Sequence, residues 1–184
     1  VTNVEAKRDV AAEAARRISL YASVAASPGT TVALTYREML EQGIPAVMIT
    51  NSLALTESGP SQGLPVFLVG GNYDSDNNAL VGDGAIEGFE RRRPISEGLL
   101  GVSGINVSAD NNGTLYVSHD AEVRVVRAMI EAVEQKLLIV ANIQKLGRGD
   151  PWQIGDIRQL SSRIPKVLLI TNEYEPWKEE LGDT

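Results

Sequence analysis

The chain contains no cysteine, one histidine and few aromatic residues, which make up 5% of its 184 positions. Without cysteine it has no disulfide, no thiolate metal ligand and no cysteine nucleophile, a composition that suits a reducing compartment such as the cytoplasm. Its longest apolar runs are as long as strands, far below the ~20 residues of a membrane span. Its formal charge of −7 argues against a DNA-binding surface, because nonspecific DNA affinity comes mainly from Lys and Arg. We therefore expect a cytoplasmic protein with no membrane partner and no nucleic-acid surface on this chain itself.

Residues typical of catalysis and metal binding are also sparse. The only histidine, His119, stands beside Asp120 at the start of a predicted helix, where a structural role is the simpler interpretation. No spacing typical of metal ligands occurs, and no nucleophile stands out beside a general base. The only basic run, Arg91-Arg92-Arg93, favours a solvated helix end. We predict no metal, no cofactor and no catalytic residues.

Short β-branched runs alternate with helix-like segments along most of the chain. Strands are predicted at residues 20–26, 46–49, 66–69, 99–102, 137–141 and 167–170. Helices are predicted at residues 4–18, 31–42, 81–92 and 120–135, with a short helical stretch opened by Ser52. A polar loop is predicted at 74–78 and a turn at Asn111-Asn112-Gly113. This alternation predicts one α/β domain over residues 1–184, with an open, mostly parallel sheet and helices on both of its faces.

Small or polar residues follow almost every predicted strand at once. The carboxyl ends of parallel strands share one edge of a sheet, so we expect these residues to converge on a single crevice, where open α/β sheets bind ligands. Their hydroxyl, amide and carboxylate groups suit recognition of a polyol rather than covalent chemistry. The predicted ligand-binding residues are Ser27, Gly29, Thr30, Thr31, Thr50, Asn51, Ser52, Gly70, Gly71, Ser103, Gly104, Asp120, Glu122, Asn142 and Lys145.

The segment from Ser27 to Thr31 indicates an anion site. A predicted strand passes through Gly29 into a helix that begins with two threonines, and the N–H groups and dipole of a helix N-terminus favour a phosphate or carboxylate. Gly29 would let the backbone approach such an anion closely. The equally simple interpretation is that Thr31 caps its helix and Gly29 turns the chain.

Lys145 follows another predicted strand. Its ammonium group could give a bound phosphate a full positive charge, although a single lysine is more often solvated surface. Asn142, three residues earlier, could bond sugar hydroxyls as both donor and acceptor. Together the two residues extend the predicted anion site toward a sugar phosphate.

Several short motifs occur in the order that is typical of a known family. They are Glu5-Ala6-Lys7-Arg8, Pro28-Gly29-Thr30-Thr31, Thr50-Asn51-Ser52-Leu53, Leu68-Val69-Gly70-Gly71, Val81-Gly82, Gly101-Val102-Ser103-Gly104-Ile105 and Lys145-Leu146-Gly147. Over residues 5–172 the chain resembles the C-terminal effector-binding domain of DeoR-family bacterial repressors. The resemblance implies a ribose-5-phosphate isomerase/glucosamine-6-phosphate deaminase-like fold and a phosphorylated sugar effector. It also implies an upstream winged helix-turn-helix that binds operator DNA.

The family's motifs fall on particular residues of this chain. The resemblance places its glycine-threonine-threonine loop on Gly29, Thr30 and Thr31, its Thr-Asn motif on Thr50 and Asn51, and its glycine pair on Gly70 and Gly71. Its late Asp-x-x-Lys motif falls on Asn142 and Lys145, so an amide replaces the usual aspartate. Ala26-Ser27-Pro28 likewise stands where an aspartate often precedes the loop. The loss of two acidic residues from one pocket suggests a more anionic or bulkier ligand, a hypothesis that preference for a neutral sugar over its phosphate would contradict.

The sequence is compatible with three classes of function. The leading prediction is the sensor domain of a repressor of carbohydrate catabolism, in which effector binding changes how attached DNA-binding modules are presented. The helix at 4–18 is a plausible transmitter, or simply a packing helix with a charged outer face. The rival is a sugar-phosphate isomerase or deaminase of the same fold, for which Asp83, Asp120 and Glu122 are the only obvious proton-transfer groups. The third is an oligomerisation module.

The chain begins at Val1, directly before a helix, so we expect a segment upstream of it. Repressors of symmetric operators assemble symmetrically, which predicts a homodimer or homotetramer.

Overall fold

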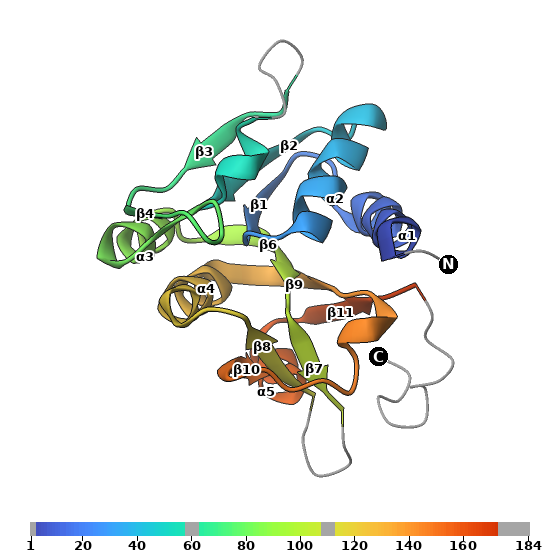
Figure 1. Ribbon diagram of the computed structural model, residues 1–184. Helices are drawn as coiled ribbons and strands as arrows, with labels where there is room; N and C mark the ends of the chain where they lie inside the picture. Colours follow the sequence, from blue (N-terminus) through green and yellow to red (C-terminus); the bar gives the residue numbers. More distant parts are fainter. Residues whose placement is uncertain (1–2, 58–62, 108–112, 173–184) are drawn as a thin grey trace.

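A six-stranded parallel sheet forms the centre of the molecule (Figure 1). The computed structural model describes residues 3–57, 63–107 and 113–172. The strands of this sheet are β1 (Ala22–Ala26), β2 (Ala46–Thr50), β3 (Val66–Leu68), β6 (Ile95–Gly101), β9 (Val133–Val140) and β11 (Lys166–Ile170), in the spatial order β11-β9-β6-β1-β2-β3. All neighbouring pairs are parallel. The predicted open parallel α/β fold is therefore confirmed.

The strand order reverses between β1 and β6. The chain adds β2 and then β3 on one side of β1, and returns to place β6, β9 and β11 on the other side. The connections that leave the carboxyl ends of β1 and β6 therefore run to opposite faces of the sheet. In open α/β sheets such a reversal leaves a crevice at the carboxyl edge, which is the usual place for a ligand.

An apolar core lies on each face of the sheet, because successive side chains of a strand point to opposite faces. On β1, Val24 and Ala26 belong to one core and Ala25 to the other. α1 (Asn3–Arg17) and α2 (Thr30–Glu41) cover the first face. α3 (Asp83–Glu90), α4 (Asp120–Ala132) and α5 (Ile157–Arg163) pack against the second core (Figure 1).

Two small antiparallel units depart from the predicted pattern. A hairpin of β4 (Asn72–Asp74) and β5 (Ala79–Val81) surrounds the predicted polar loop. β7 (Gly104–Asn106), β8 (Thr114–Val117) and β10 (Trp152–Asp156) form a three-stranded sheet. These strands and α5 are so short that no periodic pattern distinguishes them from loops. The 3₁₀ turns η1 (Leu53–Leu55), where a short helical stretch is predicted, and η2 (Ile143–Lys145) complete the described elements.

Several predicted boundaries shift because of tertiary contacts. β1 begins at Ala22, since Leu20 and Tyr21 are exposed and Tyr21 turns the chain with a φ of 64°. β6 begins at Ile95 rather than at residue 99, because its first residues already pair with β9. α3 begins at Asp83, because residue 81 belongs to β5. The first two residues of the predicted Asn111-Asn112-Gly113 turn lie outside the described residues.

The helix predicted to reach residue 135 ends at Ala132 instead, and β9 begins at the next residue. The Arg163 guanidinium donates hydrogen bonds to the carbonyls of Ile130 and Val133, at 2.8 and 3.1 Å. These bonds satisfy acceptors that a longer helix would have used itself. No glycine or proline lies at the change from helix to strand, so the sequence pattern predicts a helix that is three residues too long.

Candidate functional site

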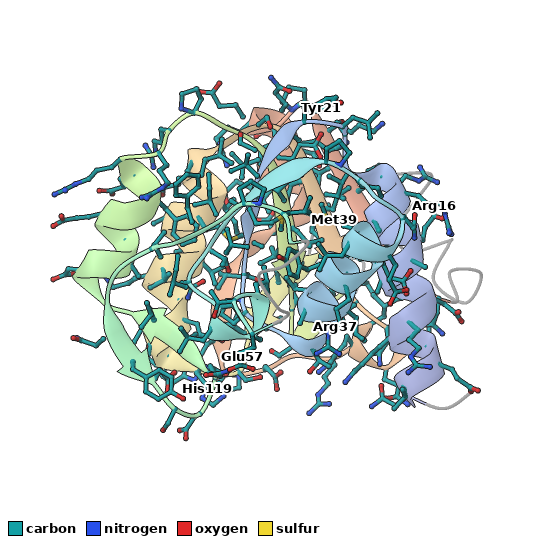
Figure 2. The ribbon with its side chains drawn as sticks, turned by 90° about the horizontal axis from the view of Figure 1, so that it is seen from above. Arg16, Tyr21, Arg37, Met39, Glu57 and His119 are labelled. Atoms are coloured by element: carbon teal, nitrogen blue, oxygen red, sulfur yellow. The ribbon has the colours of Figure 1, made fainter. Side chains whose placement is uncertain are left out.

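A cavity of about 500 Å³ opens at the carboxyl edge of the large sheet, over the reversal between β1 and β6. Segments that follow β1, β2 and β6 line it, together with α4, η2, α1 and the turn of the β4-β5 hairpin. Figure 2 shows Glu57 and His119 at this end of the molecule, and Tyr21, which precedes β1, at the opposite end. The predicted residues that line it are Ser27, Gly29, Thr30, Thr31, Ser52, Ser103, Glu122 and Lys145.

The first turn of α2 brings backbone N–H groups to this cavity. Gly29 precedes the helix with a φ of 138°, which glycine adopts without strain, and an added Cβ there would meet no atom within 4 Å. Thr31 lies inside the helix, and the N-cap makes no side-chain hydrogen bond, so the capping interpretation is wrong. The N–H groups of Thr30, Thr31 and Val32 precede the first helical hydrogen bond, from Ala33 to Gly29. With the helix dipole they form a site suited to an anion.

Two lysines add full positive charge to the same cavity. Lys7 of α1 and Lys145 of η2 both line it, and neither forms a salt bridge with a carboxylate of the described residues. Burial lowers the pKa of Lys145 from its ordinary value, the charges of Arg148 and Lys7 lower it further, and Asp150 opposes them. The ammonium groups of Lys7 and Lys145 therefore repel each other, and an anion between them would remove that repulsion.

Two serines at the strand ends differ in their hydrogen bonding. Ser27 Oγ accepts a hydrogen bond from the Gly101 N–H at 2.9 Å and donates to the Pro28 carbonyl at 3.2 Å, so it joins the ends of β1 and β6. Ser103 is only 8% exposed, and its hydroxyl has no hydrogen-bond partner among the described residues. Because a buried polar group without a partner is unfavourable, Ser103 is a strong candidate for a direct ligand contact.

The cavity wall also contains a buried carboxyl group. Glu122, in the first turn of α4, is 8% exposed. Burial raises its pKa to about 7, the positive charge of His119 opposes the shift, and Asp74 adds to it. Glu122 is therefore partly protonated at neutral pH. It contributes less negative charge to the cavity than an ordinary glutamate and can donate as well as accept a hydrogen bond.

The remaining predicted residues do not line the cavity; they are Thr50, Asn51, Gly70, Gly71, Gly104, Asp120 and Asn142. Thr50 Oγ1 donates to the Ala26 carbonyl at 2.7 Å and accepts from the Ser52 N–H at 3.0 Å, so it ties β2 to β1. Asn51 Nδ2 donates to the Leu80 carbonyl at 2.9 Å, and the backbone carbonyl of Asn51 accepts a hydrogen bond from the Leu80 N–H. Thr50 therefore holds the floor of the crevice, whereas Asn51 Oδ1 is buried without a hydrogen-bond partner among the described residues.

Two of the three glycines in this group allow close packing. A Cβ at Gly71, whose φ is 135°, would lie 2.6 Å from the Val81 carbonyl oxygen. One at Gly104 would lie 2.5 Å from the carbonyl oxygen of Arg148. A Cβ at Gly70 would make an ordinary contact, 3.8 Å from the Gly84 carbonyl oxygen at the start of α3. Gly71 and Gly104 therefore let the hairpin and the loop after η2 pack closely beside the cavity.

Asn142 and Asp120 do not line the cavity, although Asn142 Oδ1 is buried without a hydrogen-bond partner among the described residues. Asn142 is 3% exposed, and its Nδ2 donates to Asn3 Oδ1 at 2.6 Å, which attaches the first residue of α1 to the end of β9. Asp120 is exposed in the first turn of α4, where a carboxylate favours the helix dipole.

Sequence reasoning missed four polar lining residues, Lys7, Asp76, Asn77 and Ser118. Lys7 lies on a helix and not at a strand end, and only the tertiary structure defines where that helix meets the cavity. Asp76 and Asn77 belong to the hairpin turn, and Ser118 follows β8 of the small sheet, two units without a clear pattern. The family motif Glu5-Ala6-Lys7-Arg8 was the one signal that pointed to Lys7.

A second cavity, of about 700 Å³, lies between α4, β10 and α5. Its two arginines are already engaged with backbone carbonyls. Arg127 donates to those of Ile154 and Gln153, and Arg163 donates to two carbonyls at the end of α4 and the start of β9. This second cavity therefore offers less available positive charge than the cavity at the carboxyl edge.

The described residues form no group of three or more His, Asp or Glu side chains that could hold a metal ion. No helix formed by residues 3–57, 63–107 and 113–172 is long and apolar enough to cross a membrane.

The fold is an open parallel α/β domain with a cavity at its strand-order reversal. The chain belongs to the DeoR C terminal sensor domain family, whose pattern matches residues 2–165. The resemblance seen in the motif order is therefore confirmed, and the chain is a sensor domain of this type.

Comparisons with individual proteins agree with this family. The chain is 25% identical over 122 residues to the HTH-type transcriptional repressor GlcR of Bacillus subtilis strain 168. That similarity covers 66% of this chain but 45% of the repressor, so the chain spans about half the length of this relative.

Two enzymes and a translation factor subunit share the fold. Ribose 5-phosphate isomerase A from Methanocaldococcus jannaschii has a TM-score of 0.55 at 13% identity, covering 79% of this chain and 55% of the isomerase. The eIF2B delta subunit from Chaetomium thermophilum has a TM-score of 0.61 at 14% identity, covering 90% and 56%. A D-ribose-5-phosphate isomerase in complex with phospho-erythronic acid has a TM-score of 0.54 at 14% identity, covering 79% and 55%. These likenesses concern the fold alone.

Proposed function

We propose that this domain binds a phosphorylated sugar, or a closely related phosphorylated metabolite, and thereby controls operator binding by a DNA-binding domain attached upstream. The observation that carries the proposal is the convergence of three positive features on one cavity. They are the uncapped N-terminus of α2 and the ammonium groups of Lys7 and Lys145, neither of which is paired with a described carboxylate. Such a set favours a dianionic phosphate over a neutral sugar.

The rest of the cavity suits the sugar portion of such a ligand. Its volume of about 500 Å³ lies within the range of small-molecule sites. The Ser103 hydroxyl has no protein partner among the described residues, and the buried Glu122 carboxyl can exchange hydrogen bonds with a hydroxyl. The fold likeness to an isomerase in complex with phospho-erythronic acid supports the same class of ligand.

The two departures from the family's pattern strengthen the preference for an anion. Asn142 brings no carboxylate, and its Nδ2 is occupied by Asn3. Ser27 and Pro28 stand where the family often has an aspartate, and Ser27 is bonded to Gly101. The negative groups at the described lining are therefore Asp76 and the partly protonated Glu122.

A sugar-phosphate isomerase is the second candidate, and Glu122 is the observation that favours it. A carboxyl group with a pKa of about 7 is matched to proton transfer near neutral pH. The family membership favours the sensor, because the matching family is defined as a sensor domain. Measured turnover of any bound sugar phosphate, absent in Glu122→Gln, would favour the enzyme.

The partners follow from the same proposal. The relative GlcR is a helix-turn-helix repressor, and this chain covers 45% of it, which supports a DNA-binding domain upstream that contacts the operator. We propose a homodimer or homotetramer, since symmetric operators match symmetric repressors. Light scattering of the purified chain would give the subunit number, and a monomer at working concentration would contradict this part.

Isothermal titration calorimetry tests the ligand class. The chain would be titrated with ribose 5-phosphate, glucose 6-phosphate and glucosamine 6-phosphate, each matched by the unphosphorylated sugar. We expect binding of at least one phosphate and weaker or no binding of its sugar. Lys145→Gln should weaken that binding by about ten- to a hundredfold, because hydrogen bonds to charged groups contribute about 1.5–3 kcal/mol. Lys166→Gln, an exposed lysine at the amino edge of the sheet, is the matched control. Equal affinity for sugars and their phosphates would contradict the proposal.

A further inference from the structure

α1 crosses the domain from one edge of the sheet to the other. Its 15 residues span about 22 Å at 1.5 Å per residue. Its first residue, Asn3, meets Asn142 at the carboxyl edge, and Arg17 meets the amino end of β9. Figure 2 shows Arg16 toward the end of the molecule that carries Tyr21, away from His119. The same helix therefore contacts both the ligand cavity and the opposite edge of the sheet.

The carboxyl-terminal end of α1 is held by a buried charged network. Lys136 Nζ donates to the Arg17 carbonyl at 2.5 Å and to Ser19 Oγ at 3.0 Å. It also pairs with Glu97 Oε1 at 2.9 Å, and the two side chains are 12% and 4% exposed. Because breaking a buried ion pair of this kind is strongly unfavourable, this end of the helix is fixed to the sheet.

The amino-terminal end of α1 lies at the carboxyl edge of the sheet. There Asn3 Oδ1 accepts a hydrogen bond from Asn142 Nδ2, just after β9. Lys7, one turn further along, lines the same cavity as Lys145, and its charge contributes to the lowered pKa of Lys145. The buried face of the helix is mostly alanine, which gives smooth packing without large interlocking side chains. Repulsion between the two ammonium groups acts directly on this end.

We propose that Lys7 is an effector-binding residue that shares one anionic group with Lys145, so that the amino-terminal half of α1 senses whether the cavity is occupied. The inference rests on the proposed function, because it requires an anionic ligand. Without the anion, like charges push Lys7 and the start of α1 away from η2; with it, both lysines are attracted to the same group. A ligand shifts a conformational equilibrium only by its differential contacts with the two states, and Lys7 supplies that contact on α1.

Binding measurements test the role of Lys7 first. The probes are inorganic phosphate and whichever of the three sugar phosphates the wild-type chain binds most tightly. Lys7→Gln should lower the affinity about tenfold or more, Lys7→Arg should retain most of it, and Arg8→Gln, an exposed neighbour on the same helix, should not change it. The combined Lys7→Gln/Lys145→Gln variant should lose less affinity than the product of the two single losses, since both side chains contact one group.

Hydrogen–deuterium exchange then tests whether α1 responds. Saturating sugar phosphate should slow exchange of the amides at residues 7–11 in the wild type and leave residues 14–17 unchanged. Lys145→Gln at saturation should keep the slowed exchange, whereas Lys7→Gln at saturation should lose it. Circular dichroism and thermal melting of each variant without ligand confirm that it is folded, and Lys7→Arg serves as the charged reference if Lys7→Gln does not fold.

The outcomes separate this inference from the proposed function. Sugar-phosphate binding by the wild type with unchanged affinity in Lys7→Gln overturns the inference and leaves the proposed function standing. If the amides at residues 7–11 still exchange more slowly in Lys7→Gln at saturating sugar phosphate, the sensing role of Lys7 is wrong. If the wild type binds none of the sugar phosphates, the proposed function itself is wrong.

Discussion

Replacement of Glu122 by Gln gives a prediction whose size follows from the structure. Burial raises the pKa of this carboxyl group from an ordinary 4.5 to about 7. The folded protein therefore holds this proton more tightly than the unfolded chain does. The stability that the group contributes is fully present below pH 4.5 and is lost as the pH rises through 7.

The size of this loss is on the order of 3 kcal/mol, from 1.36 kcal/mol for each pKa unit. Glutamine has nearly the same shape and stays neutral, so Glu122→Gln lacks the penalty at high pH. The variant should therefore gain stability relative to the wild type as the pH increases, with most of the change between pH 4.5 and 7.5. Other carboxylates titrate in both proteins, and their effects cancel in the difference.

Urea unfolding followed by circular dichroism, repeated from pH 4.5 to 8, measures this difference. His119 and Asp74 are the charged neighbours of Glu122, so the series should be repeated in a His119→Gln background, where the pKa of Glu122 should be higher still. A stability difference that stays flat across this pH range would refute the reasoning, because it would mean that Glu122 titrates as an ordinary exposed glutamate.

Three further substitutions test other parts of the account. Lys136→Met should lower the free energy of unfolding by about 3–5 kcal/mol, because it leaves Glu97 buried without its ion-pair partner. In urea unfolding, Lys136→Met/Glu97→Leu should recover part of this loss, and no recovery in the double variant would contradict the reasoning. Gly104→Ala should lower the unfolding free energy by about 1–3 kcal/mol, because its Cβ would lie 2.5 Å from the Arg148 carbonyl oxygen, and an unchanged urea midpoint would count against this. Ser103→Ala should keep or raise the melting temperature yet weaken sugar-phosphate binding by about three- to tenfold; unchanged affinity would remove Ser103 from the site.

The parallel sheet could be predicted because buried strands carry a strong local signal. Runs such as residues 46–49 and 167–170 are apolar and are followed directly by polar residues. Both form strands of the large sheet. The helices of the first face were equally clear, and α1 and α2 lie within a residue of the predicted ranges. The small antiparallel units were missed, because strands of three to five residues have too little periodicity to identify.

The candidate site could be predicted where it follows strand ends and not where it depends on tertiary packing. Ser27, Ser103 and Lys145 come directly after or close to strands of one parallel sheet, and topology alone brings them to one cavity. Thr50 also follows a strand, but its hydroxyl turns toward the Ala26 carbonyl. Lys7 reaches the cavity because α1 packs antiparallel to the strands, which no local pattern specifies.

Amide chemical-shift mapping by NMR, during titration with the sugar phosphate that binds most tightly, tests the central claim most directly. We predict saturable shifts that are concentrated at Thr30, Thr31, Val32, Ser103 and Lys145, around the cavity at the carboxyl edge. Shifts confined to the second cavity between α4, β10 and α5, or identical shifts with the unphosphorylated sugar, would contradict the claim that this edge of the sheet holds a phosphorylated ligand.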